Sequence, residues 1–213
     1  FGLDMQRTVN GVNGKPKEPF VESNSIQEHL WAGQSVNLAL KRALSTSLTP
    51  RPGFVWLGGF RSDMEGTKAL ALVDEAARLG CGSLRFDYSG HGESGGAFEE
   101  GTISRWVDES LAVFRAHTQG PQVLVGSSMG AWISLRLVQR LQQLGEGDRI
   151  AGLLLIAPAP DFTATLMEPG FTAAQRQEME QTDRIEEPSE YSDEPMVITR
   201  ALIEDGRDNL VLT

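Results

Sequence analysis

A serine flanked by glycines is the first residue of this chain that could do chemistry. The run Gly126-Ser127-Ser128-Met129-Gly130 follows an apolar segment and precedes a stretch with helical periodicity. At a sharp turn from a strand into a helix, a serine projects its hydroxyl above the strand end, and glycines let the neighbouring backbone approach closely. We therefore predict that Ser128 attacks a carbonyl carbon and that Gly126 and Gly130 belong to the turn. A serine that only caps the helix is the alternative.

A serine nucleophile also needs two N–H groups that stabilise the charge developing on the carbonyl oxygen in the transition state. The residue after the nucleophile supplies one of them, which here is Met129. The loop after the apolar run FVWL carries Gly58-Gly59-Phe60, so we expect the Phe60 N–H to be the second donor. An ordinary tight turn would use the same two glycines, and this alternative remains open.

The histidines of the chain do not fit the order that this serine motif requires. His29, His91 and His117 all precede Ser128, whereas hydrolases with this motif place the acid and then the histidine after the serine. His91 lies between two glycines within a turn, which favours a role in backbone geometry. His117 is expected at the end of a helix, where a histidine interacts favourably with the C-terminus, and His29 is expected at the surface of a hairpin.

The elements that must position these residues follow from hydrophobic periodicity. Two alternating segments around 26–31 and 36–40 predict an antiparallel hairpin. From Phe54 onward, short apolar runs alternate with amphipathic stretches, which is typical of an α/β fold with a mostly parallel sheet and helices on both faces. The runs FVWL, SLRF, QVLV and IAGLLLIA are the expected strands. The last of them, at 150–157, is apolar throughout and predicts a buried strand.

Three helices are expected between these strands. The first has apolar residues at spacings of three and four from Ala69 to Ala76, with a capping box at 62–65 and an end at Gly80. The second carries its apolar face between Ile103 and Phe114. The third is expected from Ala131 to Leu144, directly after the serine motif.

An acidic segment from Asp161 to Asp208 interrupts the alternation. It carries thirteen acids and four arginines, a net charge of −9 within a chain of net charge −10. Two helices are expected in it, near Thr172 to Gln181 and from Pro195 to Asp205, with Gly206 at the exit. We expect residues 161–208 to form a helical cap over the catalytic face, within a single domain over residues 1–213. A solvated acidic face is the alternative.

The composition excludes several classes of protein. Hydrophobic residues make up 40% of the chain and charged residues 23%, which is ordinary for a globular domain. Long apolar runs and signal-peptide patterns are absent, so we predict no membrane span and a cytoplasmic location, or the mitochondrial matrix in a eukaryote. The negative charge disfavours nucleic acid as a partner. The single cysteine, Cys81, excludes a cysteine-based metal cluster, and we predict no metal and no cofactor.

Four stretches resemble a known family. They are GTKALAL at 66–72, RFDYSGHGES at 85–94, GSSMGAW at 126–132 and PSEYS at 188–192. These stretches are similar to the alpha/beta-hydrolase branch that contains palmitoyl-protein thioesterase and acyl-glucuronide esterase, over about residues 54–208. The resemblance implies an alpha/beta-hydrolase fold and a serine hydrolase that cleaves carboxylic esters or thioesters of small molecules or acylated proteins.

The resemblance also implies an acid and a histidine on the last two strand ends, which these 213 residues do not include. We therefore expect the chain to lack the last strands of the fold, to be nearly inactive by itself and to expose residues 150–157 as a sheet edge. Some members of the fold take their acid from the position of Asp161. In this branch the acid follows the cap, so Asp161 is better suited to accept backbone hydrogen bonds.

The competing hypothesis is a non-catalytic protein of the same fold that uses the pocket under the cap for binding. A histidine supplied by a partner subunit is a third possibility. The sequence leaves the oligomeric state open.

Overall fold

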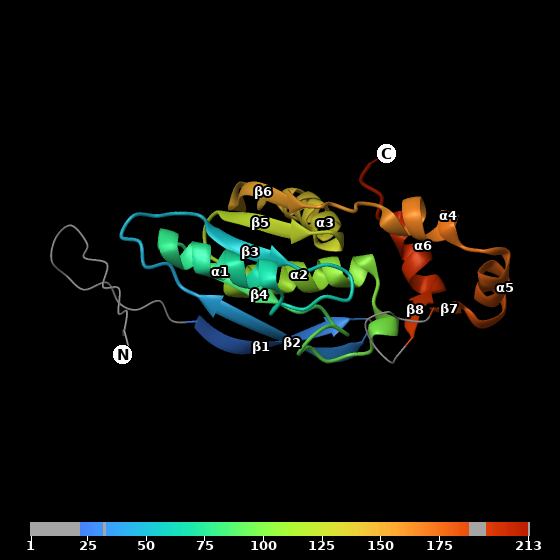
Figure 1. The fold of residues 1–213 in the computed structure, drawn as a ribbon. Helices are drawn as coiled ribbons and strands as arrows, with labels where there is room; N and C mark the ends of the chain where they lie inside the picture. Colours follow the sequence, from blue (N-terminus) through green and yellow to red (C-terminus); the bar gives the residue numbers. More distant parts are fainter. Residues whose placement is uncertain (1–21, 32, 188–194, 213) are drawn as a thin grey trace, which may run out of the picture.

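A six-stranded sheet forms the centre of the protein in a computed structural model, which describes residues 22–31, 33–187 and 195–212. Its strands are β1 (Glu22–Trp31), β2 (Gln34–Ala43), β3 (Gly53–Leu57), β4 (Ser83–Phe86), β5 (Gln122–Ser127) and β6 (Ile150–Ile156). Their order across the sheet is β1-β2-β4-β3-β5-β6 (Figure 1). Strands β4, β3, β5 and β6 run parallel, and β1 and β2 form an antiparallel hairpin, as the sequence predicts.

Three long helices cover both faces of the sheet, as the periodicity predicts. They are α1 (Thr67–Leu79), α2 (Ile103–His117) and α3 (Met129–Gln143). Val55 and Leu57 of β3 pack in the core that includes α2 and α3, whereas Trp56 between them packs with Ala69 of α1 on the other face. Because successive side chains of a strand point to opposite faces, one apolar run serves both layers. In Figure 1, α1 lies in front of the sheet and α3 behind it.

Strand β6 is not a buried strand, and this prediction is wrong. No residue of β6 is fully buried, and Leu153 and Leu154 are 40% and 51% exposed. Within the described residues β6 pairs only with β5, so it forms the edge of the sheet. An apolar strand is therefore exposed on both faces, which is the unprotected edge expected at residues 150–157.

The start of α1 also differs from its prediction. The helix begins at Thr67 after Gly66, and no side chain caps it. The expected capping box at 62–65 does not form, because its two N–H groups donate elsewhere: the Ser62 N–H to the Gly59 carbonyl oxygen and the Glu65 N–H to the Asp63 carboxylate. The end of the helix is as expected, with Gly80 in the left-handed conformation at φ 70°.

The acidic segment is a mixed unit and not a purely helical one. It contains the π-helical turn η3 (Thr163–Met167), α4 (Glu168–Gly170), α5 (Ala173–Thr182), β7 (Arg184–Glu187), β8 (Met196–Thr199) and α6 (Arg200–Asp208). Helix α5 follows its prediction and has a capping box of Thr172 and Gln175. The helix expected from Pro195 is wrong: residues 196–199 form a strand paired with β7. The Thr199 hydroxyl accepts the Leu202 N–H and starts α6 only there, and Gly206 lies inside that helix.

The acidic segment lies at the end of the sheet towards which β3 and β5 point (Figure 1). Asn209, just after α6, ties it to the sheet helices: its carbonyl oxygen accepts the Trp132 indole N–H at 2.9 Å, and its amide donates to the Ser104 hydroxyl at 2.8 Å. Two short 3₁₀ turns, η1 (Phe98–Glu100) and η2 (Gly147–Arg149), complete the described elements. The PSEYS stretch at 188–192 lies outside the described residues.

Candidate active site

Ser128 occupies the sharp turn between β5 and α3. Its backbone has φ 53° and ψ −117°, a conformation that residues with a side chain rarely adopt. Backbone bonds hold it there: the Ser128 N–H donates to the Ile156 carbonyl oxygen at 3.0 Å, and the Ser128 carbonyl oxygen accepts the N–H groups of Ala131 and Ala159. The hydroxyl does not cap α3. This serine is therefore held in a strained turn with its side chain free for other contacts, which weakens the capping alternative.

Gly126 and Gly130 are required by close backbone contacts. A Cβ atom on Gly130 would lie 2.0 Å from the Leu57 carbonyl oxygen and 2.5 Å from that of Gly58. One on Gly126 would lie 2.4 Å from the Gly130 carbonyl oxygen. Such distances are far inside van der Waals contact, so both positions need glycine. The first turn of α3 thereby packs directly against the end of β3 and the loop after it.

The loop at Gly58-Gly59-Phe60 lies beside the serine. A Cβ atom on Gly59 would lie 3.5 Å from the Ser128 Cβ, which is ordinary contact. Neither Gly59 nor Gly126 has a positive φ, and the room at the Gly59 Cβ position means that, unlike Gly126, it is not required by a close contact. Its carbonyl oxygen accepts both the N–H and the hydroxyl of Ser62, which closes the loop into a turn.

The two expected oxyanion donors are without a protein acceptor. Within the part of the chain that the structure describes, neither the Phe60 N–H nor the Met129 N–H donates to another group. Met129 is fully buried, and the Phe60 ring packs edge-on against Phe98, Phe162 and Trp106. The buried Met129 N–H thus has no protein partner among the described residues, which is uncommon, and two N–H groups beside a serine can donate hydrogen bonds to an anionic oxygen.

His91 is engaged by other groups and makes no hydrogen bond to Ser128. Its Nδ1 lies 3.1 Å from the Ser89 carbonyl oxygen, and its Nε2 accepts the Arg61 N–H at 3.3 Å. Burial lowers the pKa of His91 from 6.5 to about 4, with the Arg61 charge acting in the same direction. The imidazole is therefore neutral near pH 7, and both nitrogens already have partners.

The other two histidines lie away from the serine turn. His117 ends α2, and its Nε2 is 2.9 Å from the Gln27 side-chain oxygen of β1. His29 lies on β1 and is half buried, so it is less exposed than predicted. Among the described residues, no histidine is hydrogen-bonded to Ser128.

Asp161 holds the two ends of the acidic segment together. It is buried, has φ 57°, and its carboxylate accepts the N–H groups of Val211 and Leu212, each at 2.9 Å. Its carbonyl oxygen accepts the N–H groups of Ala164 and Thr165. The predicted bonds at the first turn are therefore made by the backbone, whereas the carboxylate clasps the chain after α6. No histidine among the described residues is hydrogen-bonded to this carboxylate.

The sequence reading missed two residues that hold the loop after β3. The Asp87 carboxylate accepts the Met64 N–H at 2.7 Å, and the Tyr88 hydroxyl lies 3.4 Å from the Gly58 carbonyl oxygen. Burial raises the pKa of both side chains. The signal was available: polar side chains directly after the apolar strand SLRF stand at the edge of the sheet where Ser128 also stands.

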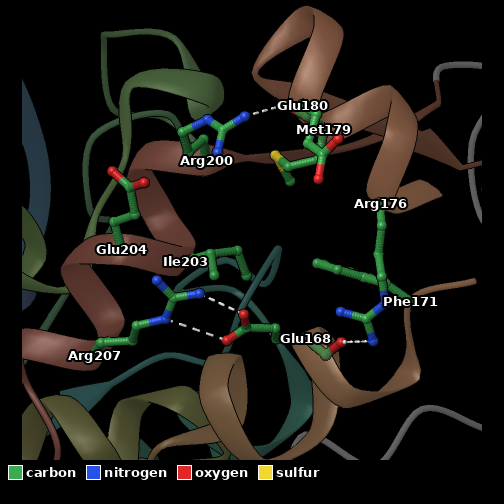
Figure 2. A pocket seen from close by; sticks show the side chains of 9 residues that line it. All are labelled: Glu168, Phe171, Arg176, Met179, Glu180, Arg200, Ile203, Glu204 and Arg207. Atoms are coloured by element: carbon green, nitrogen blue, oxygen red, sulfur yellow. Dashed lines mark hydrogen bonds and ion pairs between the residues drawn. The ribbon is translucent and has the colours of Figure 1, made fainter. Parts of the chain in front are cut away.

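A cavity of about 190 Å³ lies within the acidic segment, apart from the serine turn. Figure 2 shows its walls, which are Glu168, Phe171, Arg176, Met179, Glu180, Arg200, Ile203, Glu204 and Arg207. Arg207 pairs with Glu168, Arg200 donates to the Met179 carbonyl oxygen, and Arg176 donates to the Glu168 carbonyl oxygen. The arginines are thus occupied by the protein itself.

Within the described ranges, no group of three or more His, Cys, Asp or Glu side chains could hold a metal ion. No helix of those ranges is long and apolar enough to cross a membrane.

The chain is similar in sequence to known hydrolases. The profile of the alpha/beta hydrolase family matches residues 52–208. The human protein named palmitoyl-protein thioesterase ABHD10, mitochondrial, is 35% identical over 158 residues, which are 74% of this chain and 48% of the human protein. The chain therefore spans about half the length of the curated relatives it matches.

Solved structures are similar as well. A crystal structure of a protein from Agrobacterium vitis S4 has a TM-score of 0.83 and 47% identity, and covers 91% of this chain and 74% of that one. The alpha/beta hydrolase domain-containing protein 10 from mouse has a TM-score of 0.71 and 29% identity, and covers 88% of this chain and 71% of that one.

Proposed function

Because the chain belongs to the alpha/beta hydrolase family, we propose that it is a serine hydrolase that cleaves carboxylic esters or thioesters through an acyl-enzyme on Ser128. The observation that carries the proposal is the strained backbone of Ser128, next to two N–H groups without a protein acceptor. Strain of this kind persists only where the surrounding structure imposes it, and it is concentrated at functional sites.

In the proposed reaction the Ser128 oxygen attacks the acyl carbonyl carbon while a general base takes the hydroxyl proton. The carbonyl oxygen becomes an anion that accepts hydrogen bonds from the Phe60 and Met129 N–H groups. The C–S or C–O bond then breaks, the leaving thiolate or alkoxide takes the proton, and the acyl group stays on Ser128. Water attacks this acyl-enzyme in the same way and releases the carboxylic acid. Neither half-reaction calls for a metal or a cofactor.

The general base is proposed to lie outside residues 1–213. His91 has both nitrogens occupied, and His29 and His117 are bonded or placed elsewhere. Loss of such a base lowers turnover by about a million-fold and leaves the modest effect of the oxyanion donors. The 213 residues by themselves are therefore proposed to be nearly inactive.

We propose an apolar acyl group as the part of the substrate that the site accepts. Phe60, in the loop beside Ser128, packs edge-on against Phe162 at 5.6 Å between ring centroids, and Trp132 packs on Phe162, so the aromatic side chain next to this loop is apolar. The acidic segment, which we propose to act as a cap, disfavours strongly anionic substrates at low salt. A relative named palmitoyl-protein thioesterase makes a fatty acyl thioester the first substrate to test.

A fluorophosphonate probe tests the proposal, because a serine activated for acyl transfer displaces its fluoride and becomes covalently labelled. The natural full-length protein is expected to be labelled, and the Ser128→Ala variant to be unlabelled. Ser127→Ala is the matched control, since the neighbouring serine is buried at the end of β5 and should leave labelling intact. Equal labelling of Ser128→Ala would contradict the assignment of the nucleophile.

A non-catalytic binding protein is the second candidate, and the lack of a histidine bonded to Ser128 among the described residues favours it. An unlabelled full-length protein that still binds a fatty acyl thioester would establish this alternative.

The relatives are named mitochondrial proteins. We therefore propose the mitochondrial matrix ahead of the cytoplasm as the location of this protein.

A further inference from the structure

We propose that His91 is a positioning residue for the oxyanion loop. Its neutral imidazole links the Ser89 carbonyl oxygen to the Arg61 N–H, and this link fixes the turn from which the Phe60 N–H reaches the reacting oxygen. The inference rests on the proposed function of Ser128. It assigns a task to a histidine that the reaction itself does not use.

The hydrogen bonds determine which nitrogen of His91 carries the proton. A carbonyl oxygen only accepts, so the Nδ1 that faces Ser89 must donate. The Nε2 then has a free lone pair, and the Arg61 N–H donates to it at 3.3 Å. Only the neutral Nδ1–H form satisfies both partners, because a second proton on Nε2 would face the Arg61 N–H. The pKa lowered to about 4 by burial agrees with this form.

The bond to Arg61 acts directly next to the proposed donor. Arg61 follows Phe60 and has φ 55°, the left-handed conformation that non-glycine residues rarely adopt. Such a residue returns to a common conformation unless its neighbours hold it. The Arg61 N–H belongs to the peptide unit that begins at the Phe60 carbonyl, so the imidazole fixes the orientation of that unit.

Two aromatic rings connect the imidazole with the Phe60 side chain. The His91 ring lies 5.1 Å from Phe98 and 5.2 Å from Trp106, between centroids. The Phe60 ring lies 5.0 Å and 6.2 Å from the same two rings. The Trp106 indole N–H also donates to the Ser89 carbonyl oxygen at 3.3 Å. His91 and Phe60 therefore share one aromatic support.

His91 is the contact nearest to Phe60 among three from the same loop. Tyr88 reaches the Gly58 carbonyl oxygen at the start of the turn, and Asp87 reaches the Met64 N–H after its end. These two contacts hold the two ends of the segment 58–64, whereas the His91 contact holds Arg61 at its centre. Removing only the His91 contact should leave the segment folded but release the Phe60–Arg61 peptide.

Two substitutions separate positioning from simple packing. In His91→Gln the side-chain oxygen can take the place of Nε2 and accept the Arg61 N–H. In His91→Asn the shorter amide reaches only the place of Nδ1 and leaves the Arg61 N–H without its acceptor. His117→Asn is the control for loss of a histidine, since His117 contacts Gln27 and not this loop.

The test has a structural readout and a functional one. In residues 1–213, long-range ¹H–¹⁵N spectra at pH 7 should show His91 protonated on Nδ1. Amide exchange of Arg61 should be at least about tenfold faster in His91→Asn than in His91→Gln, the ratio expected when one hydrogen bond is lost. In the full-length protein, the fluorophosphonate labelling rate should fall by about tenfold to a hundredfold in His91→Asn, less than the loss of an oxyanion donor, and stay near wild type in His91→Gln and His117→Asn.

Protonation on Nε2, or equal Arg61 exchange in the two His91 variants, would overturn the inference. A labelled wild type whose His91→Asn variant is labelled at the same rate would also overturn it while leaving the proposed function intact. A wild type that is never labelled would overturn the proposed function and with it the catalytic purpose of the link.

Discussion

The serine turn and the acidic segment are stabilised in opposite ways. At the turn, uncharged contacts dominate: glycine backbones in close approach, backbone hydrogen bonds around Ser128 and the aromatic rings around Phe60. In the acidic segment, a small apolar cluster of Met179, Ile185, Ile198 and Ile203 is surrounded by ion pairs on the surface. Close packing at the serine turn leaves no room for an added atom. The exposed ion pairs of the acidic segment contribute little individually, so the loss of one partner has a small effect.

This difference matches what each region is proposed to do. A catalytic hydroxyl and its oxyanion donors must be held to within a fraction of an ångström, and close packing of backbone achieves that. A cap that admits substrates has no such requirement. Solvated ion pairs stabilise it weakly and leave it adjustable.

The largest expected effect comes from a methyl group at the serine turn. Gly130→Ala would place a Cβ atom 2.0 Å from the Leu57 carbonyl oxygen, so the first turn of α3 must move away from β3. We expect a loss of about 3 kcal/mol or more in the free energy of unfolding, measured by urea denaturation. Gly170→Ala in the acidic segment is the control, since nothing lies within 4 Å of its Cβ position. Equal effects at the two glycines would remove the contrast between the regions.

A second large effect is expected on lowering the pH, through His91. Because its pKa falls from 6.5 when unfolded to about 4 in the fold, the unfolded chain binds more protons between these values. The contribution of His91 to the free energy of unfolding is therefore fully present above pH 6.5. It decreases by on the order of 3 kcal/mol as the pH falls to 4. The groups that face the imidazole are Arg61, whose charge adds to the effect, and the phenol of Tyr88.

Urea denaturation of wild type and His91→Gln at pH 7 and pH 4.5 isolates this contribution. Asp87, whose raised pKa acts in the opposite direction, is common to both proteins and cancels. The wild type is expected to lose more stability than the variant on acidification. The same loss in both would show that His91 titrates normally.

A smaller effect is expected at Asp161, which holds the two ends of the acidic segment together. Asp161→Asn replaces one of its two accepting oxygens with an NH₂ group that faces a backbone N–H, and should cost about 2 kcal/mol. Asp183→Asn is a matched control, since Asp183 also has a positive φ but is exposed and pairs only with Arg200 and backbone. Amide exchange should become faster at Val211 and Leu212 only in the first variant. Unchanged amide exchange at Val211 and Leu212 would show that the Asp161 carboxylate is not needed to hold this part of the chain.

The smallest effect is expected within the acidic segment itself. Arg207→Gln removes the ion pair with Glu168, whose two side chains are 51% and 30% exposed. We expect a loss of about 0.5 kcal/mol at low salt that becomes smaller as salt is added. Lys68→Gln, which alters an exposed residue of α1, serves as the control for a lost charge. A loss above about 2 kcal/mol would show that this segment is held as rigidly as the serine turn.

Local patterns predicted much of the fold. The apolar runs at 54–57 and 122–125 became β3 and β5, and the apolar spacing between Ile103 and Phe114 became the buried face of α2. The glycine-flanked serine became the turn between β5 and α3. In each case neighbouring residues suffice, because periodicity and glycine conformation act over a few positions.

Two errors show where local patterns fail. The capping box at 62–65 did not form, since the Glu65 N–H donates to Asp63, and Asp87, distant in sequence, holds the neighbouring Met64 N–H. The helix expected at Pro195 began late because residues 196–199 pair with β7. Pairing partners far along the chain override the helical preference of a short segment.

The amino-acid sequence by itself determined the alternation of strands and helices, the serine at its turn and the acidic character of the segment after β6, since each depends on residue types close together in the chain. Only the tertiary structure decided what His91 and Asp161 contact. His91 accepts an N–H thirty residues earlier and Asp161 binds N–H groups fifty residues later, and such pairings depend on how the strands come together and not on any spacing that a local pattern records.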